Sequence, residues 1–305
     1  MDIDAGGLTF QLKDQALFKQ KCFIDGKWVD SESGDTFDVY NPSDLTTVGS
    51  MPNCSKSDTI KAIEAAKKSW TAWRKLTGKD RSIIIRKWHE LILENIDDLA
   101  LIMTLENGKP IADSRGEIIY ASWFTDWFSE EAKRTYGKTI PSTMADRRMM
   151  SIKQPIGVCG IITPWNFPAA MITRKIAPAL AAGCPVVIKP AGSTPFSATA
   201  LVELAHRAGV PSGVINLISV SEENVSEVGD ELCTNNDVRK ISFTGSTNVG
   251  RALIAKTAST IKKVSMELGG HAPLIIFEDA DLDEAVEGAM AVSYTHLTLP
   301  TNREV

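Results

Sequence analysis

The hydrophobic positions of the first half of the chain predict short strands followed by three helices. Over 21–50, short alternating runs are broken by Asp-Gly, Ser-Gly and Asn-Pro pairs, a pattern typical of strands and turns. Ser55 and Asp58 are spaced as a capping box, and the apolar residues after them recur at helical spacing. The same spacing predicts a second helix from about Asp80 to Asn107 and a third from about Asp113 to Tyr136.

Glycines and prolines mark where this helical part ends. Gly108 and Gly137 follow the second and third predicted helices and are expected to stop them. The Trp and Phe residues of these helices recur at helical spacing, so we expect them in the core rather than in a ligand site. Residues 138–156 alternate weakly and contain two prolines, which predicts a protruding hairpin or an edge-strand excursion.

From Gly157 onward the pattern changes to short apolar strands that alternate with helices. The strand runs are GVCGII, PVVIKP, VINLIS and RKISFTG. Such alternation predicts an α/β fold, a Rossmann-like and mostly parallel sheet with helices on both faces. Ligands of such sheets bind at the carboxyl ends of the strands. The predicted helices are Ala169–Ala182, Thr194–Ala208, Glu222–Leu232 and Gly250–Thr260.

Three of these strand ends carry polar residues or glycine. The first is followed by TPWNFP (163–168), in which Asn166 offers a side-chain amide, and the second by Lys189. The third runs through 244–250 into a helix, whose free N–H groups favour an anion such as a pyrophosphate. Alone, this last element is equally well explained as a tight turn and a helix cap. Together, the three strand ends favour a dinucleotide crevice.

Glu267, in VSMELGG, is a further candidate. A carboxylate before a Gly-Gly turn can reach a place where the backbone comes close. Elsewhere a Glu before Gly is usually a solvated surface residue. Its apolar flanks favour a partly buried position with a tunable pKa.

The charge balance excludes several classes of partner. The formal net charge is −5, and no basic block is present, so nucleic acid and anionic membranes are poor partners. No apolar run reaches the roughly 18 residues that a membrane-spanning helix needs. The N-terminus resembles neither a secretory signal nor a transit peptide, so the expected location is the cytoplasm.

The five cysteines are widely spaced and form no C-x-x-C pair. An odd number without metal-ligand spacing predicts reduced thiols, and neither a disulfide frame nor a metal site.

Four motifs together resemble the aldehyde dehydrogenase superfamily. TPWNFP, KPA, FTGS-x-x-x-G and ELGG occur in that family's order and spacing, and the similarity covers about residues 18–291. It is greatest to succinate-semialdehyde dehydrogenases. The segments that carry this similarity are 103–110 (MTLENGKP), 152–158, 166–191 and 279–291.

The resemblance implies roles for several residues. Asn166 would stabilise the oxyanion formed from the aldehyde, and Glu267 would be the general base. Lys175 would support the nicotinamide side of the site. Arg174 would pair with a distal carboxylate of the substrate; the alternative is a surface arginine on an amphipathic helix.

The resemblance also implies a cofactor cleft for NAD or NADP. Lys189 would hold the adenosine ribose, Gly245 and Ser246 the pyrophosphate, and Val249 would pack on the adenine. The full set of implied cofactor-binding residues is Thr163, Pro164, Trp165, Asn166, Lys189, Ala191, Gly192, Ser193, Gly245, Ser246, Val249 and Leu268.

One departure from the family pattern concerns cofactor preference. Relatives that prefer NAD often carry a Glu after K-P-A/S, which bonds the ribose hydroxyls, whereas this chain has Gly192 and Ser193 there. Without that carboxylate a 2′-phosphate is not repelled, so NADP is slightly favoured over NAD.

The nucleophile that the resemblance implies is absent. In the family a cysteine lies roughly 34 residues after the ELGG glutamate, and this chain has Thr301 near that place and no cysteine after Cys233. Cys159 and Cys184 are predicted to be small core residues. We therefore expect the catalytic domain to be largely missing and this chain to be inactive.

The predicted organisation has five parts. Strands and helices of the cofactor-binding domain (1–137) precede an oligomerisation-type hairpin (138–156). The dinucleotide-binding domain (157–270) and the start of a catalytic domain (271–291) follow. In the last part, 292–305, VSYTHLTLPT resembles the translation of a transposase-type sequencing adapter, so we interpret it as a non-native tail. The rival explanation is an authentic divergent C-terminus.

Two classes of function remain open. In the first, the full-length parent enzyme is a homo-oligomer that oxidises succinate semialdehyde with NAD(P), through a covalent thiohemiacetal and thioester. Glutarate semialdehyde or another carboxylated aldehyde is the alternative substrate. In the second, the protein is a catalytically dead nucleotide-binding or interaction protein. An unrelated Rossmann dehydrogenase is disfavoured because the chain has no G-x-G-x-x-G.

Overall fold

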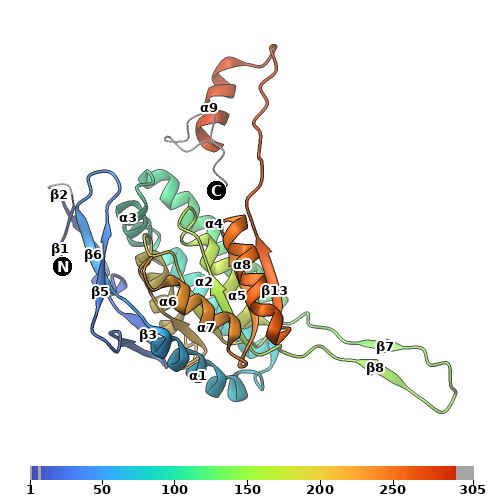
Figure 1. The fold of residues 1–305 in the computed structure, drawn as a ribbon. Helices are drawn as coiled ribbons and strands as arrows, with labels where there is room; N and C mark the ends of the chain where they lie inside the picture. Colours follow the sequence, from blue (N-terminus) through green and yellow to red (C-terminus); the bar gives the residue numbers. More distant parts are fainter. Residues whose placement is uncertain (1, 6–7, 293–305) are drawn as a thin grey trace.

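The computed structural model describes residues 2–5 and 8–292 (Figure 1). The predicted tail at 292–305 therefore lies outside the described residues, except for Val292. The strands of the structure are β1 (Asp2–Ala5), β2 (Leu8–Gln11), β3 (Cys22–Ile24), β4 (Lys27–Val29), β5 (Thr36–Tyr40), β6 (Thr47–Pro52), β7 (Lys138–Ile140), β8 (Met149–Ser151), β9 (Val158–Ile162), β10 (Val186–Lys189), β11 (Ile215–Leu217), β12 (Val238–Thr244) and β13 (Lys263–Glu267). Its α-helices are α1 (Lys56–Trp73), α2 (Gly78–Glu94), α3 (Ile96–Asn107), α4 (Ile111–Glu131), α5 (Ala170–Ala181), α6 (Phe196–Arg207), α7 (Val225–Thr234), α8 (Thr247–Thr257) and α9 (Leu282–Val292), with short 3-10 turns at Gln15–Leu17 and Ala258–Thr260.

The main sheet has seven strands in the order β13-β12-β9-β10-β11-β3-β4. The first five are mutually parallel, and β3 and β4 add an antiparallel edge. The chain moves from β9 outward to β10 and β11, then returns to the other side of β9 to form β12 and β13. This reversal creates a topological switch point between β9 and β12, where ligands of doubly wound sheets bind. The predicted Rossmann-like, mostly parallel sheet is confirmed.

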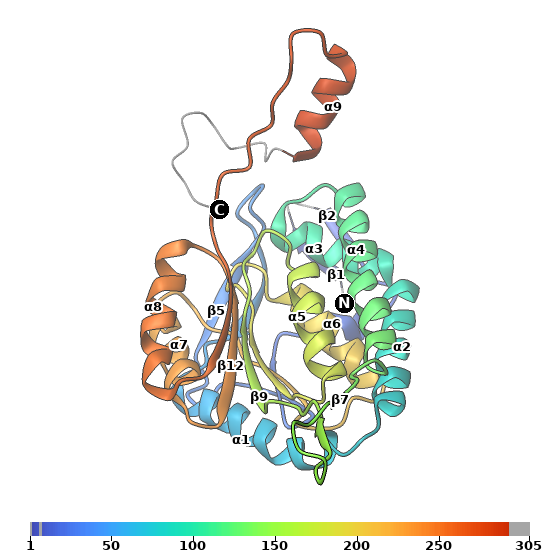
Figure 2. The same ribbon diagram turned by 90° about the vertical axis from the view of Figure 1, so that its right-hand side faces the viewer.

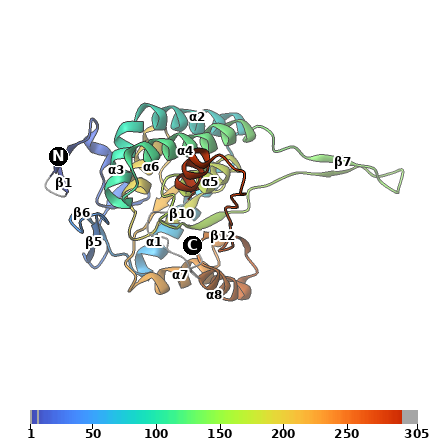
Figure 3. The same cartoon turned by 90° about the horizontal axis from the view of Figure 1, so that it is seen from above.

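Helices cover both faces of the sheet (Figures 2 and 3). On one face α5 and α6 contact the strands, and α2, α3 and α4 pack outside them; α1, α7 and α8 cover the other face. Strand β9 is buried on both faces of the sheet. Cys159 and Ile161 belong to one buried cluster, and Val158 and Ile162 belong to the other. A strand buried on both sides explains why these runs show no polar alternation.

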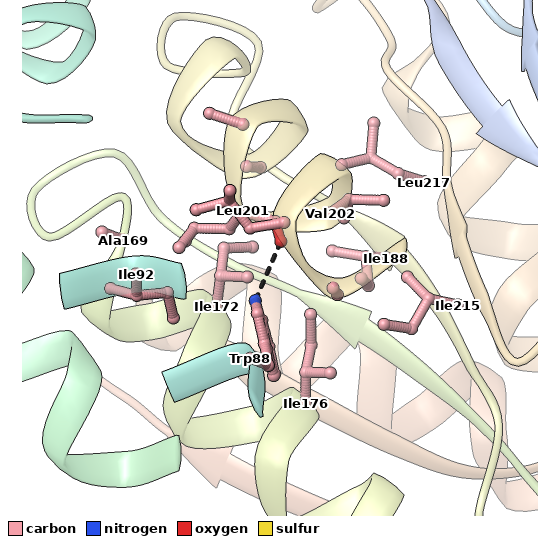
Figure 4. Close-up of a cluster of buried hydrophobic side chains, with 14 of the residues drawn as sticks. Trp88, Ile92, Ala169, Ile172, Ile176, Ile188, Leu201, Val202, Ile215 and Leu217 are labelled. Atoms are coloured by element: carbon pink, nitrogen blue, oxygen red, sulfur yellow. Dashed lines mark hydrogen bonds between the residues drawn. The ribbon is translucent and has the colours of Figure 1, made fainter. Parts of the chain in front are cut away.

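Trp88 occupies the centre of the larger cluster (Figure 4). It comes from α2 and is fully buried. Side chains of α5, including Ile172 and Ile176, and side chains of α6 surround it. Its indole nitrogen donates to the Leu201 carbonyl at 3.0 Å. This contact joins the outer helical layer to the layer that covers the sheet.

Two of the predicted helices differ from the observed ones. The capping box at Ser55 and Asp58 is confirmed, but the second predicted helix is two helices that meet at Asn95. Asn95 leaves helical geometry (φ −113°, ψ 22°), and its side-chain amide donates to the Leu91 carbonyl at 2.8 Å. An Asn side chain that bonds the backbone competes with helix continuation, which explains the break. Gly108 ends α3 in the left-handed conformation (φ 78°), as predicted.

The third predicted helix is shorter than expected. It ends at Glu131 rather than near Tyr136. Tight-turn hydrogen bonds of Lys133 and Arg134 to the carbonyls of Glu130 and Glu131 redirect the chain towards β7.

The prediction that the Trp and Phe stripes lie in the core is wrong for two residues of α4. Trp123 and Trp127 are 60% and 64% exposed. The buried face of α4 carries Ile118, Ala121 and Thr125, so the two indoles, one turn apart, lie on the other side of the helix. Helical spacing identified a stripe but could not show which side the protein covers.

The hairpin β7–β8 projects from the body, which confirms the predicted protrusion (Figure 1). Beyond β13 the chain leaves the body and leads to α9 (Figure 1). In the part of the chain that the structure describes, no helix combines the length and apolarity that crossing a membrane requires. The division into five parts stays a prediction.

We expect Trp88→Phe to lower the free energy of unfolding by about 1–3 kcal/mol, because it shrinks a buried side chain and removes the bond to Leu201. The matched control Trp123→Phe changes an exposed indole and should shift that free energy by less than about 0.5 kcal/mol. Urea unfolding followed by circular dichroism measures both. Equal effects of the two substitutions would contradict the central position of Trp88.

Candidate active site at the carboxyl edge of the sheet

The strand pairing brings the polar strand ends to one edge of the sheet. Ile162, the last residue of β9, is opposite Lys189 of β10 on one side and Phe243 of β12 on the other. Thr244 is in turn opposite Glu267, the last residue of β13. The segments that follow β9, β10, β12 and β13 therefore leave the sheet side by side at the switch point.

Backbone contacts fix the loop 163–168 that follows β9. The Asn107 side-chain amide donates to the Trp165 carbonyl at 2.8 Å, and the Lys109 ammonium donates to the Asn166 carbonyl at 3.1 Å. The side-chain oxygen of Asn166 accepts from the Phe167 N–H at 3.0 Å. The amide nitrogen of Asn166 is left as a donor, and no described residue accepts from it. A donor held this way could bind a developing oxyanion.

Lys175 links α5, which follows β9, to β12 on the other side of the switch point. Its ammonium donates to the Ser242 hydroxyl of β12 at 3.0 Å. Burial lowers the pKa of Lys175 to about 8, while the nearby Glu267 carboxylate acts in the opposite direction. The two charges therefore lie within electrostatic range of one another at the end of β13.

Glu267 itself is exposed. The prediction that its apolar flanks bury it is wrong, because β13 is the edge strand of the sheet and the described residues leave its outer side uncovered. The carboxylate lies at the carboxyl end of β13, opposite Thr244 of β12.

Arg174 precedes Lys175 on α5 and lies against aromatic rings. Its guanidinium is 4.8 Å from the Phe124 ring centre and 5.6 Å from that of Tyr120, and it donates to the Tyr120 hydroxyl. No carboxylate among the described residues pairs with it. A half-buried guanidinium held by rings and a phenol, and without a counter-ion in the described chain, is suited to an anionic ligand.

Lys189 is buried at the end of β10. Its ammonium donates to the Pro190 carbonyl at 3.0 Å, and burial lowers its pKa to about 8. An ammonium has three donors, so further acceptors are needed to satisfy it. Beyond it Ala191 and Gly192 are half-buried and Ser193 is exposed. A Cβ on Gly192 would lie 3.0 Å from the Val220 carbonyl, so this backbone is closely packed.

The segment after β12 begins helix α8. Ser246 is its N-cap, and the serine oxygen accepts from the Val249 N–H. Leu268 packs against Gly250, where a Cβ would collide with it. The side chains of Val249, Leu268 and Trp165 are exposed on this edge. The free N–H groups of a helix start thus lie beside an apolar surface.

Two buried threonine hydroxyls at the switch point have no hydrogen-bond partner in the described chain. They belong to Thr163, directly after β9, and to Thr244, at the end of β12. A buried unpaired hydroxyl is costly, and a polar ligand in the crevice would satisfy it. With the Lys189 ammonium and the α8 N-terminus, the residues present fit a dinucleotide. Pro164, between Thr163 and Trp165, is half-buried.

Three residues of the site were not predicted from the sequence. Lys109 and Glu117 form a buried ion pair beneath Asn166, and Tyr120 contacts Arg174. Lys109 lies in the MTLENGKP segment, whose similarity to the family was the available signal. Glu117 and Tyr120 carry no local pattern, because only tertiary packing brings α4 against α5.

None of the cysteines lies beside Asn166 or Glu267. All five are free and buried. Cys159, Cys184 and Cys233 lie near the amino ends of β9, β10 and β12, at the opposite edge, and the first two are core residues as predicted. Cys22 and Cys54, with their sulfurs 3.3 Å apart, contact Ser219 beyond β11. That strand is four places from β13, about 19 Å at the usual strand spacing. Within residues 2–5 and 8–292, no group of His, Cys, Asp and Glu side chains could hold a metal ion.

Comparisons with known proteins identify the family that this chain resembles. Residues 28–297 match the model of the aldehyde dehydrogenase family. Glutarate-semialdehyde dehydrogenase of Pseudomonas putida is 57% identical over 284 residues, covering 93% of this chain and 58% of that enzyme. An NADP(+) succinate-semialdehyde dehydrogenase of Escherichia coli is 56% identical over the same shares of the two chains.

The fold is shared as well. A crystal structure described as an E. coli NADP dependent enzyme has a TM-score of 0.88 at 56% identity, covering 92% of this chain and 58% of that one. The chain thus spans about 58% of the length of the curated relatives it matches. On the family match, these identities and the shared fold, the chain belongs to the aldehyde dehydrogenase family.

Proposed function

We propose that this chain supplies the cofactor cleft and the substrate anchors of an NADP-dependent dehydrogenase for aldehydes that carry a distal carboxylate. The observation that carries the proposal is the register of β9, β10 and β12. It aligns Lys189, the Asn166 loop and the start of α8 at one switch point. Succinate semialdehyde is the proposed substrate, and glutarate semialdehyde is the alternative, since relatives named for each are equally similar.

For the cofactor, Lys189 would donate to the adenosine ribose, and Gly245 and Ser246 would present the α8 N-terminus to the pyrophosphate. Val249 would pack on the adenine, and Trp165 and Leu268 would line the cleft. A bound nicotinamide supplies the hydride acceptor of the reaction. No carboxylate follows Ala191, and the names of the E. coli relative and structure refer to NADP. Both observations favour NADP over NAD.

For the chemistry, the Asn166 amide nitrogen would donate to the oxygen of the attacked aldehyde. Glu267 would accept a proton from the attacking thiol or water. Lys175, held by Ser242, would place a positive charge near Glu267. The thiol that must add to the carbonyl is not among the five cysteines placed in the structure, so residues 2–5 and 8–292 supply only part of this machinery.

For the substrate, Arg174 would pair with the distal carboxylate. Its support is the unpaired guanidinium on Tyr120 and Phe124, in the helix that begins directly after the Asn166 loop. A guanidinium that lies against the Tyr120 and Phe124 rings favours this role over that of a surface arginine on an amphipathic helix.

A second function is favoured by one observation, the absence of a cysteine from the described crevice. In that case the chain binds nucleotide and performs no turnover. The two proposals share the cofactor cleft and differ in chemistry.

We expect the chain to bind NADP+ at least tenfold more weakly after Lys189→Met, because an ionic hydrogen bond contributes about 1.5–3 kcal/mol. The affinity of the unsubstituted chain should fall as the pH rises through about 8, where Lys189 loses its proton, and the variant should lack this dependence. Isothermal titration calorimetry at several pH values measures both. Lys262→Met is the matched control: the pKa of Lys262 is also lowered to about 8 by burial, but it lies at the amino edge of the sheet. Equal losses in both variants would count against the cleft.

Arg174 can be tested in a chimera that continues this chain after Ala291 with the corresponding remainder of the E. coli relative. Arg174→Met should lower kcat/KM for succinate semialdehyde at least tenfold and change that for butyraldehyde less than about threefold. Steady-state kinetics measure the ratio. Arg74→Met is the control, because the Arg74 guanidinium also lies over an aromatic ring, that of Trp70, but at the end of α1. An equal loss with both aldehydes would remove the carboxylate-pairing role.

The chain as it stands should reduce no NADP+ when mixed with succinate semialdehyde, because none of its cysteines adjoins Asn166 or Glu267. The absorbance of the reduced nicotinamide measures this. A rate that disappears when all five cysteines are replaced by serine would show that one of them reaches the aldehyde.

A further inference from the structure

A buried ion pair lies directly beneath the Asn166 loop, and the proposed function does not use it. Glu117 of α4 and Lys109, just before α4, form the pair, and their side chains are 1% and 11% exposed. Isolated charges are rarely buried so deeply, because taking them out of water costs several kcal/mol each. The hydrogen bonds that compensate this cost join the pair to the start of α5 and to the loop before it.

The carboxylate holds the start of α5. One oxygen of Glu117 accepts from the N–H groups of Ala169 and Ala170 at 2.9 and 3.2 Å, and the other takes the Lys109 ammonium. These N–H groups belong to the first turn of α5, where no helical carbonyl is available to them. The helix start has no side-chain cap of its own, so Glu117 takes that place from another helix.

The ammonium holds the loop before α5. Lys109 donates to the Asn166 carbonyl at 3.1 Å and lies 4.2 Å from the ring centre of Phe167. The pair therefore contacts every residue from Asn166 to Ala170 except Pro168, whose ring already restricts the backbone. Charged hydrogen bonds therefore hold this segment at both ends, at Asn166 and at Ala169 and Ala170.

Glu106 shows that a buried glutamate can cap a helix start without a lysine partner. It caps α6 in the same manner, with its two oxygens accepting from the N–H groups of Phe196 and Ser197 at 2.7 Å. It has no lysine partner in the described chain. The lysine at Glu117 adds a bond to the one loop that carries the proposed oxyanion donor.

We propose that Lys109 and Glu117 are positioning residues, which lock the segment 166–170 and thereby fix the Asn166 amide relative to Arg174 and Lys175 on α5. The inference rests on the proposed role of Asn166. The pair acts through the backbone and touches neither substrate nor cofactor. Without the ammonium, a buried carboxylate remains unpaired, and both the loop and the start of α5 lose their fixed position.

The test uses the ¹⁵N-labelled chain and amide hydrogen exchange read by NMR. Lys109→Met should accelerate exchange at Phe167, Ala169 and Ala170 at least tenfold beyond any change in the slowest core amides. It should also shift or broaden the side-chain amide signals of Asn166, which are assigned by their loss in Asn166→Asp. Lys109→Arg keeps a cation and should restore the exchange rates to within about threefold of those of the unsubstituted chain.

Asp98→Asn is the matched control, because the buried Asp98 accepts from two backbone N–H groups, those of Lys13 and Asp14, far from the loop. It should lower global stability without selective acceleration at 167–170. If Lys109→Met accelerates these amides only as much as Asp98→Asn does, or if Lys109→Arg fails to restore them, the positioning role is wrong. NADP+ binding by the unsubstituted chain reports separately on the proposed function.

Discussion

The parallel pairing of β9 with β10 on one side and β12 on the other is the constraint on which the site depends. Ile162 is opposite Lys189 and Phe243 at once, so three segments from distant parts of the chain leave the sheet at the same level. A shift of one residue in either pairing would turn the end of that strand to the other face. Such a shift is opposed by burial, because the side chains of β9 alternate between two clusters and are enclosed on both faces.

Helix α5 is the second element on which the site is built, because it carries Arg174 and Lys175 and begins at the Asn166 loop. Tyr120 and Phe124 of α4 contact the guanidinium, and Glu117 of α4 caps the helix start. Ser242 of β12 holds the ammonium of Lys175. Helix α5 is thus held from α4 at Arg174 and at its first turn, and from the sheet at Lys175. A change in the packing of α4 would therefore act directly on Arg174 and on the start of α5.

Much of this fold could be predicted from local patterns. Apolar strands, the Gly108 stop and the Ser55 capping box depend on neighbours in the sequence, and they appear where expected. The errors have tertiary causes. Asn95 breaks a helix through its own side chain, and Trp123 faces away from the layer that covers α4. Glu267 is exposed because its strand lies at the edge of the sheet. None of these facts follows from spacing along one segment.

The residues of the site divide in the same way, into those that local patterns indicate and those that only tertiary contacts bring together. Lys189, Asn166 and Ser246 could be proposed from the sequence because each lies at the end of a predicted strand or in the short segment that follows it. Lys109 and Glu117 could not, since their importance comes from a contact between α4 and the start of α5. A strand end specifies which residues meet, but hydrogen bonds from outside the sheet decide how firmly they are held. Because the oxyanion role proposed for Asn166 requires a fixed distance to the reacting carbonyl, the positioning role proposed for Lys109 and Glu117 would bear on that same chemistry.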